Sequence, residues 1–228
     1  MGQLVELNHI IEHGLAAYPG LPGVKIQALY DHQASRALYR DQAEFFIGRI
    51  EMSFNTGTCL NSPFHRHRHL EDLSQIPLQR VAGLKGVVVE APFSDRRQAK
   101  RAIDIALPAE KLRGRAVLFR TGWDRHWGKE AYVQSGPYLS ATTLEALIQA
   151  RAVLVGVDFL NVDDLADTSR PAHTRLLDAG ILIVENLTNL QALPLEGFLF
   201  SAVPLRIKMG ASFPVRAFAE ITAGSKSE

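Results

Sequence analysis

The chain has 228 residues, of which 46% are hydrophobic and 21% are charged, and its formal net charge is +1. This length and composition fit one soluble globular domain with a sizeable core. The near balance of acidic and basic residues excludes a whole-chain electrostatic attraction to nucleic acid or to an anionic membrane.

No targeting or membrane-spanning segment is visible in the sequence. The first six residues lack a basic region followed by an apolar run, so no secretory signal is expected. The longest apolar runs, such as residues 152–157, are far too short to span a bilayer. The chain has one cysteine, Cys59, so it cannot form an intrachain disulfide. We therefore expect a cytoplasmic protein with no membrane partner.

The first clear strand is predicted over residues 46–54, where apolar and polar residues alternate and leave one apolar face. Shorter β-branched or apolar runs follow, and they are typical of strands buried on both faces of a sheet. These runs are residues 86–89, 116–119, 152–157, 181–184 and 198–200.

Two helices are predicted between these strands. The first begins after Ser140, a favoured N-cap residue, and apolar residues follow it at helical spacing. The second is expected over residues 171–179, because Pro171 suits a first helical turn and Gly180 supplies a stop.

Strands outnumber helices, and the C-terminal half shows some β-α-β alternation. This order predicts a mixed α/β fold, with a mixed sheet or flattened barrel as the core and helices outside it. We expect a single domain over residues 1–222. The small polar residues 223–228 are expected to form a disordered tail.

The segment 55–65 is the most informative part of the sequence. Gly57 permits a tight turn, and Pro63 fixes the chain before the last residue of the segment. If the loop folds back on itself, four of its side chains cluster, as ligands of a metal do. These four are Asn55, Cys59, Asn61 and His65. A cysteine thiolate is a strong zinc ligand, but a neutral asparagine suits a hard cation or a hydrogen bond better. Spacing alone favours a structural loop over a metal site.

Three histidines at two-residue spacing follow, namely His65, His67 and His69. In an extended chain they would share one side but stand about 6–7 Å apart, too far for three ligands of one metal. We interpret His67 and His69 as part of a solvated basic loop. His65 differs because it belongs to the structured segment.

A second group of candidates surrounds His173 and Glu185. His173 lies in the first turns of the predicted second helix, and Glu185 follows the strand 181–184 on the same side as its isoleucines. Ends of buried strands are common places for catalytic groups, although a carboxylate there also caps a strand. Asp158, with residues 163–164, fits a hard-cation cluster less well than a loop organised by aspartates.

Aromatic residues offer an apolar wall for a small-molecule pocket. The candidates are Tyr18, Phe64, Trp123 and Trp127. Aromatic side chains more often belong to the core, which is the competing interpretation.

Taken together, these segments resemble the cyclase family that includes bacterial kynurenine formamidase (arylformamidase). The resemblance covers nearly the whole chain in several separate blocks, which implies a β/β/α swivel fold and a homodimer. The segments that carry it are residues 4–7, Tyr18-Pro19-Gly20, 55–65, 118–123, 155–158, 173–187 and 213–217.

The loop motif of that family is His-x-Gly-Thr-His-x-Asp-x-Pro-x-His. The resemblance places its three main ligands for a divalent metal, zinc or manganese, at Asn55, Cys59 and Asn61, so none is retained. A conventional zinc site is therefore not expected, and the alternative is a weak site using Cys59, Glu185 and His65.

His65, His173 and Glu185 match family residues used for proton transfer and for a second metal position. The resemblance implies hydrolysis of an amide or lactam C–N bond in a small molecule, with these three residues catalytic and with Tyr18, Phe64 and Trp123 as substrate-binding candidates.

Three alternatives stay open at this point. The first is a non-catalytic protein that binds a small molecule in the same pocket. The second is a metal-independent lyase or isomerase that uses a His–Glu pair. The third is a nucleic-acid contact through Arg66 and Arg68, which the near-neutral chain makes the weakest.

Overall fold

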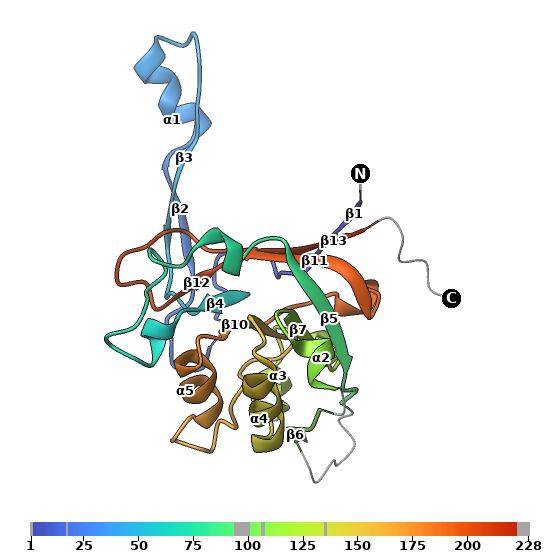
Figure 1. Ribbon diagram of the computed structural model, residues 1–228. Helices are drawn as coiled ribbons and strands as arrows, with labels where there is room; N and C mark the ends of the chain where they lie inside the picture. Colours follow the sequence, from blue (N-terminus) through green and yellow to red (C-terminus); the bar gives the residue numbers. More distant parts are fainter. Residues whose placement is uncertain (1, 17, 94–100, 106–107, 135, 223–228) are drawn as a thin grey trace.

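Four parallel strands form the centre of a nine-stranded mixed sheet, and antiparallel strands extend it on both sides (Figure 1). The computed structural model describes residues 2–16, 18–93, 101–105, 108–134 and 136–222. The predicted tail 223–228 lies outside these residues.

The order of the strands in the sheet is β1-β13-β11-β5-β7-β9-β10-β4-β12. The strands are β1 (Gln3–Glu6), β4 (Cys59–Asn61), β5 (Leu84–Glu90), β7 (Ala116–Arg120), β9 (Leu154–Val157), β10 (Leu182–Glu185), β11 (Glu196–Val203), β12 (Ser212–Pro214) and β13 (Arg216–Ile221).

Two short pairs of strands lie outside this sheet, β2 (Lys25–Tyr30) with β3 (Ile47–Glu51) and β6 (Ala102–Ile103) with β8 (Tyr138–Leu139). The α-helices are α1 (His32–Arg36), α2 (Ala109–Leu112), α3 (Glu130–Gln134), α4 (Ala141–Ala150) and α5 (Pro171–Asp178). Single 3-10 turns are η1 (Ala37–Tyr39), η2 (Pro63–His65), η3 (Leu78–Arg80), η4 (Trp123–His126) and η5 (Leu190–Ala192). No helix among the described residues combines the length and the apolar character needed to cross a membrane.

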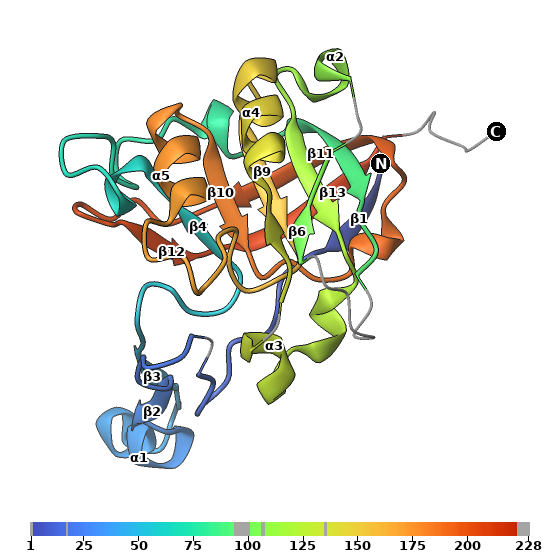
Figure 2. The ribbon, with the colours of Figure 1, turned by 90° about the horizontal axis from the view of Figure 1, so that it is seen from below.

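The sheet separates two apolar cores. Helices α4 and α5 lie side by side on one face, and the curl of the sheet encloses the other core (Figures 1 and 2). Neighbouring residues of one strand serve different cores, since Val117 packs on the helix side and Leu118 on the opposite side. Strands that are buried on both faces read as continuous apolar runs, which is why the central strands were recognisable in the sequence. The predicted mixed sheet with helices outside is confirmed.

Local signals set the two main helices where they were predicted. The Ser140 hydroxyl accepts a hydrogen bond from the Thr143 amide at 3.1 Å and so caps α4. Pro171 is the first residue of α5, and Gly180, with φ +72°, follows its end. The chain then turns directly into β10, so α5 delivers His173 and β10 delivers Glu185 to the same face of the sheet.

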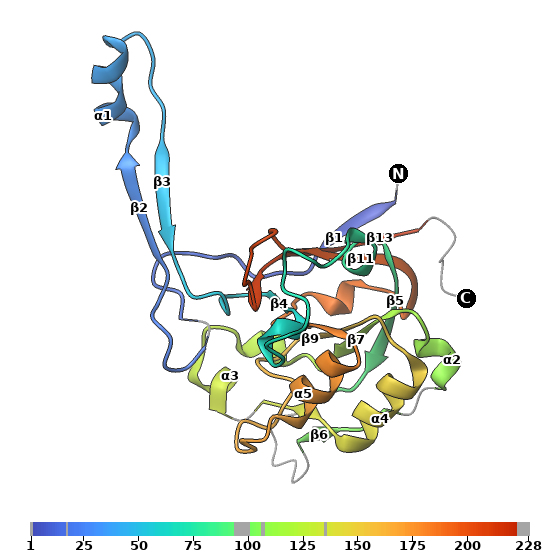
Figure 3. The ribbon, with the colours of Figure 1, turned by 60° about the vertical axis from the view of Figure 1, so that its left-hand side comes forward.

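The strand predicted over residues 46–54 departs from expectation. Within this range the strand is β3, which ends at Glu51 and pairs with β2. Every residue of β2 and β3 is exposed. With α1 at its tip, this hairpin projects far from the sheet (Figure 3), and we call residues 25–51 the arm. Alternation identifies a strand, but it cannot say whether the apolar face meets this chain or something else.

Candidate functional site

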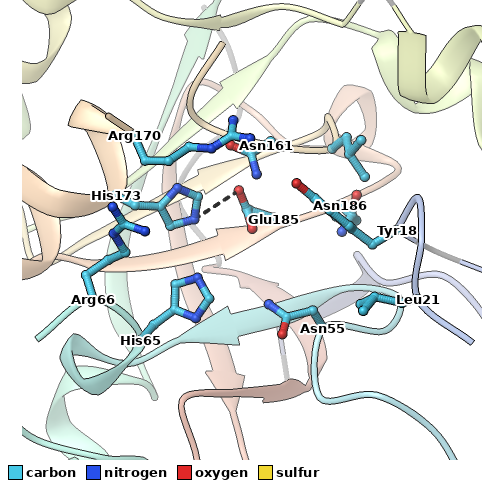
Figure 4. A pocket seen from close by; sticks show the side chains of 11 residues that line it. Tyr18, Leu21, Asn55, His65, Arg66, Asn161, Arg170, His173, Glu185 and Asn186 are labelled. Atoms are coloured by element: carbon cyan, nitrogen blue, oxygen red, sulfur yellow. Dashed lines mark ion pairs between the residues drawn. The ribbon is translucent and has the colours of Figure 1, made fainter. Parts of the chain in front are cut away.

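A cavity of about 240 Å³ opens where β4, β10 and the start of α5 converge. Its volume is below the ~300–1,000 Å³ typical of sites for drug-sized ligands, so it suits a small molecule. The residues that line it are Tyr18, Leu21, Asn55, His65, Arg66, Leu160, Asn161, Arg170, His173, Glu185 and Asn186 (Figure 4).

The sheet register explains why distant parts of the sequence meet here. Cys59 and Glu185 are direct partners in the antiparallel pair of β4 and β10, so their side chains share one face. Glu185 follows Ile183 onto the helix side of the sheet, as its alternation predicted. His65 ends η2, which begins at Pro63 immediately after β4.

A buried line of three charged groups forms the floor of the site. Asp163 Oδ2 lies 2.7 Å from His173 Nδ1, and His173 Nε2 lies 3.4 Å from Glu185 Oε1. Asp163 also accepts the amide hydrogens of Ala172 and His173 at the start of α5. Asp163 thereby fixes both the helix and the orientation of the imidazole ring.

Charge interactions within this line outweigh the effect of burial. Burial by itself lowers the pKa of His173, but the carboxylates of Glu185 and Asp163 raise it to about 9. Burial acts to raise the pKa of Glu185, yet the charge and hydrogen bond of His173 hold it below the ordinary value. The pKa of Asp163 is lowered against burial for the same reason. At neutral pH the line therefore holds a histidine cation between two carboxylates.

His65 is the neutral member of the site. Its ring centroid lies 5.4 Å from that of His173. Burial lowers the pKa of His65 to about 4, and the positive charge of His173 acts in the same direction. The cavity thus contains one protonated and one unprotonated imidazole side by side.

The Gly57-Thr58 part of the motif forms hydrogen bonds that hold the loop against the end of β10. Asn186, with φ +59°, donates a hydrogen bond from its side-chain Nδ2 to the Gly57 carbonyl at 2.9 Å. The main-chain carbonyl of Asn186 accepts a hydrogen bond from the Thr58 hydroxyl at 2.5 Å. The Tyr132 hydroxyl donates to Asn186 Oδ1 at 2.8 Å. These bonds tie the loop to the end of β10 and hold His65 close to Glu185.

The three positions of the family's metal ligands do not form a conventional zinc or manganese site. Asn61 Nδ2 donates to Glu185 Oε2 at 3.0 Å, so the amide meets the carboxylate directly. Burial, followed by the nearby charge of Glu185, raises the pKa of the Cys59 thiol to about 12, which keeps it protonated. Asn55 lines the cavity as a neutral amide. Zinc sites are built from thiolates, neutral imidazoles and carboxylates, and these three positions carry two neutral amides and a protonated thiol.

Both carboxylate oxygens of Glu185 already have partners within the protein. The Val162 amide donates to Oε1 at 3.0 Å, and Asn61 and His173 also contact the carboxylate. Among the described residues, no three His, Cys, Asp or Glu side chains are grouped as metal ligands. The weak site of Cys59, Glu185 and His65 is therefore not supported by the donor chemistry.

The aspartates near β9 organise loops, as the sequence favoured. Asp158 accepts the Thr121 amide at 2.8 Å, the Thr121 hydroxyl at 2.5 Å and the Gly122 amide at 2.7 Å. Burial raises the pKa of Asp158 to about 7, while these donors oppose the rise. Asp164 pairs with Arg101 at 3.0 Å. The hard-cation cluster considered from the sequence is not formed.

The predicted aromatic wall is only partly present. Tyr18 lines the cavity, but Phe64 and Trp123 are not among the lining residues. Trp123 is 2% exposed, donates to the Tyr132 carbonyl at 3.2 Å and packs in the helix-side core. Trp127 stacks on His9 with ring centroids 3.9 Å apart. Aromatic composition could not distinguish core from cavity, because both need large apolar surfaces.

Several cavity residues were not predicted as cavity residues. Arg66 was considered only for a nucleic-acid contact, while Asn161 and Arg170 come from loops whose course depends on the tertiary fold, and Leu21 precedes the arm. The sequence favoured a loop-organising role for Asp163 over a hard-cation cluster, and it did not predict the contact with His173. The position of Asp163 ten residues before His173, at the start of a helix, is the clue that was available.

Comparisons with known proteins agree with this fold. Residues 5–164 match the protein-family model described as "Putative cyclase". The kynurenine formamidase of Salinibacter ruber is 31% identical over 221 residues, which cover 94% of this chain and 95% of that protein. Isatin hydrolase A from Ralstonia solanacearum superposes with a TM-score of 0.81 at 21% identity, covering 96% of this chain and 92% of that one.

A further solved structure, described as a potential metal-dependent hydrolase with cyclase activity, has a TM-score of 0.74 at 19% identity and covers 98% of this chain and 100% of that one. The solved structures share the fold, and the family model together with the Salinibacter protein shows common descent. The chain therefore belongs to the cyclase family.

Proposed function

We propose that this protein hydrolyses an amide or lactam C–N bond of a small substrate bound in the cavity. The observation that carries the proposal is the buried Asp163–His173–Glu185 line beside a neutral His65. Relatives named kynurenine formamidase and structural neighbours named isatin hydrolase support the same reaction class.

The chemical roles follow from the protonation states. His65, being unprotonated, takes a proton from a water molecule whose oxygen attacks the substrate carbonyl carbon. The His173 imidazolium stabilises the negative charge that develops on the carbonyl oxygen. Its Nε2 proton is available for this, because the 3.4 Å contact with Glu185 is looser than the 2.7 Å contact with Asp163.

The C–N bond then breaks, and the proton held by His65 passes to the leaving nitrogen. A carboxylic acid and an amine are the products, so one water is consumed for each bond cleaved. Glu185 and Asp163 keep His173 protonated throughout. No step is routed through a metal ion, because the donor set at residues 55, 59 and 61 does not fit one.

A second function, small-molecule binding without turnover, is favoured by the same three neutral positions. The family's ligand positions are changed while a cavity of about 240 Å³ is present, and a binding protein needs only the cavity. A metal-independent lyase or isomerase would use the same imidazole pair, and its products would contain no added water.

Substrate turnover with matched variants tests these alternatives. A panel of N-formyl anilines and small lactams is assayed by chromatography with the wild type, His65→Ala and Glu185→Gln. We expect at least a 100-fold loss of rate in each variant, in the range given by removal of a general acid–base group. His69→Ala, which alters an exposed histidine of the same loop that does not line the cavity, is the control and should keep its rate.

Equal rates in wild type and both cavity variants would contradict the catalytic assignment. Binding without turnover by the wild type would favour the binding protein. A product that lacks the elements of water would favour the lyase or isomerase.

We also propose a homodimer formed through the arm. Eight large apolar residues of the arm are exposed, with exposed fractions between 41% and 60%. Such side chains together present on the order of 800 Å², close to the ~800 Å² that each partner contributes to a standard interface. The arm carries four basic and four acidic residues, so two arms can meet without net repulsion.

A further inference from the structure

Two arginines line the cavity without a carboxylate partner among the described residues. Arg66 donates to the Thr174 hydroxyl at 3.3 Å and to the Ser169 carbonyl at 3.5 Å. Arg170 donates from Nη1 to the Asp164 carbonyl at 3.0 Å. The hydrogen bonds of these guanidinium groups among the described residues are all to neutral oxygens, and the exposed Asp167 carboxylate interacts with Arg170 only through its charge.

The acidic groups of the site are not available to neutralise these arginines. The carboxylate of Asp163 is saturated by donors from α5, and that of Glu185 by His173, Val162 and Asn61. Their negative charge is directed at the His173 imidazolium. Asp163 and Glu185 therefore do not pair with Arg66 or Arg170, and both arginines can accept a carboxylate from a ligand.

Both arginines are held in place. Arg66 is anchored to α5 and the loop before it, and the neighbouring His67 ring contacts the Thr174 carbonyl at 3.0 Å. Arg170 has a left-handed backbone, with φ +50°, directly before Pro171. Such conformations cost energy in residues with side chains, and they cluster at ligand sites. Positioned guanidinium groups lose less entropy when they bind a carboxylate.

The opposite wall of the cavity is different in character. Arg66, Arg170 and the two histidines lie on one side, and Tyr18 and Leu21 lie on the other (Figure 4). Leu160, which also lines the cavity, is buried and apolar. A ligand that satisfies both sides has a charged group at one end and an apolar ring or chain at the other.

We propose that Arg66 and Arg170 bind a carboxylate carried by the ligand, so that the protein selects a small apolar acid over its neutral analogue. Guanidinium groups match the planar carboxylate in a bidentate way. The inference rests on the proposed function for the cavity as the substrate site, and it adds the chemical class of the substrate. The reacting amide would lie between this carboxylate and His65.

Binding of unreactive probes tests the proposal without any turnover. Benzoate and phenylacetate are compared with benzamide and phenylacetamide by calorimetric titration of the full chain. We expect the acids to bind more tightly than the amides. Arg66→Gln and Arg170→Gln should each weaken binding of the acids about 10-fold, as loss of a charge-assisted hydrogen bond does. The amides should bind all proteins alike.

Arg68→Gln is the matched control, because Arg68 is an exposed arginine of the same loop and does not line the cavity. Its affinity for the acids should equal that of the wild type. If Arg170→Gln does not fold, Arg170→Lys replaces it, since lysine keeps the charge but loses the bidentate geometry. A smaller loss of acid binding in Arg170→Lys would support the proposal.

Equal binding of acids and amides by the wild type would overturn the proposal, as would no binding of either acid. Unchanged acid binding in Arg66→Gln and in the Arg170 variant would do the same. The failure of the proposed hydrolysis would look different, because the acids would still bind selectively while no amide or lactam was cleaved.

Discussion

At the scale of single residues, the bond between Asn61 and Glu185 is the most consequential contact of the site. The Asn61 amide donates a hydrogen to a carboxylate that is already charged. An aspartate at this position would place two carboxylates together, an arrangement that needs a cation or a raised pKa. Asparagine satisfies Glu185 with a neutral donor, and the His173 imidazolium supplies the positive charge.

A prediction about metal content follows. Purified protein should carry zinc and manganese far below one ion per chain, because residues 55, 59 and 61 offer neutral groups only. Elemental analysis after dialysis measures this. The triple variant Asn55→His, Cys59→His, Asn61→Asp restores the family ligands and should take up metal. Near-stoichiometric metal in the dialysed wild type would refute the prediction.

The raised pKa of His173 predicts a specific dependence of stability on pH. A histidine whose pKa is about 9 when folded and near 6.5 when unfolded stabilises the protein fully below pH 6.5. That contribution is lost as the pH rises through 9. The free energy of unfolding should therefore fall by roughly 2–4 kcal/mol between about pH 6 and pH 10.

Urea denaturation at several pH values measures this, with His173→Gln as the comparison. The variant keeps Cys59 and every other ionisable group, so it should show a weaker loss of stability over the same range. Parallel curves for the two proteins would mean that His173 is not held as a cation. Histidine titration by NMR in the wild type gives an independent check.

At the scale of elements, α5 and β10 act as one unit that places the acid–base residues. The turn at Gly180 is short, so α5 and β10 run in opposite directions and the start of α5 lies near the end of β10. Asp163 secures the start of α5 through the Ala172 amide at 2.6 Å. The helix and strand were predictable from Pro171, from Gly180 and from the apolar run 181–184 that follows Gly180.

The position of β4 was not predictable in the same way. Cys59, Leu60 and Asn61 form only three residues of strand, too few for a periodic signal. Their place between β10 and β12 is set by pairing with residues more than a hundred positions away. Sheet register decides which side chains face the cavity, and a one-residue shift would reverse them.

At the scale of the whole molecule, the arm is the feature that the fold leaves unexplained without a partner. An isolated two-stranded hairpin is marginally stable in water, and here it exposes residues on both strands (Figures 1 and 3). Tyr18 and Leu21 precede the arm and Asn55 follows it, so a second copy seated on the arm would lie beside the cavity.

We expect the wild type to be a dimer at micromolar concentration and the variant Leu29→Glu, Ile50→Lys to be a monomer, because these changes place charge in the apolar patch. Analytical ultracentrifugation measures the mass. Leu195→Glu, an exposed apolar residue outside the arm, serves as the control and should stay dimeric. A wild type that sediments as a monomer would rule out the proposed assembly.

The sequence by itself determined the central strands, both main helices with their caps, and the candidates His65, His173 and Glu185. These features depend on local periodicity, on cap residues and on a motif contained in eleven positions. The same information separated His65, which lines the cavity, from His67 and His69, which do not. His69 is exposed as expected, but His67 is half-buried against α5.

Only the tertiary structure decided the rest. It moved Trp123 into the core, added Asp163 to the buried line of charged groups, set Arg66 and Arg170 beside the cavity and joined Asn61 to Glu185. The physical reason is that each of these facts is a contact between segments far apart in the chain. Such contacts depend on how strands pair and curl, which no local pattern of residues records.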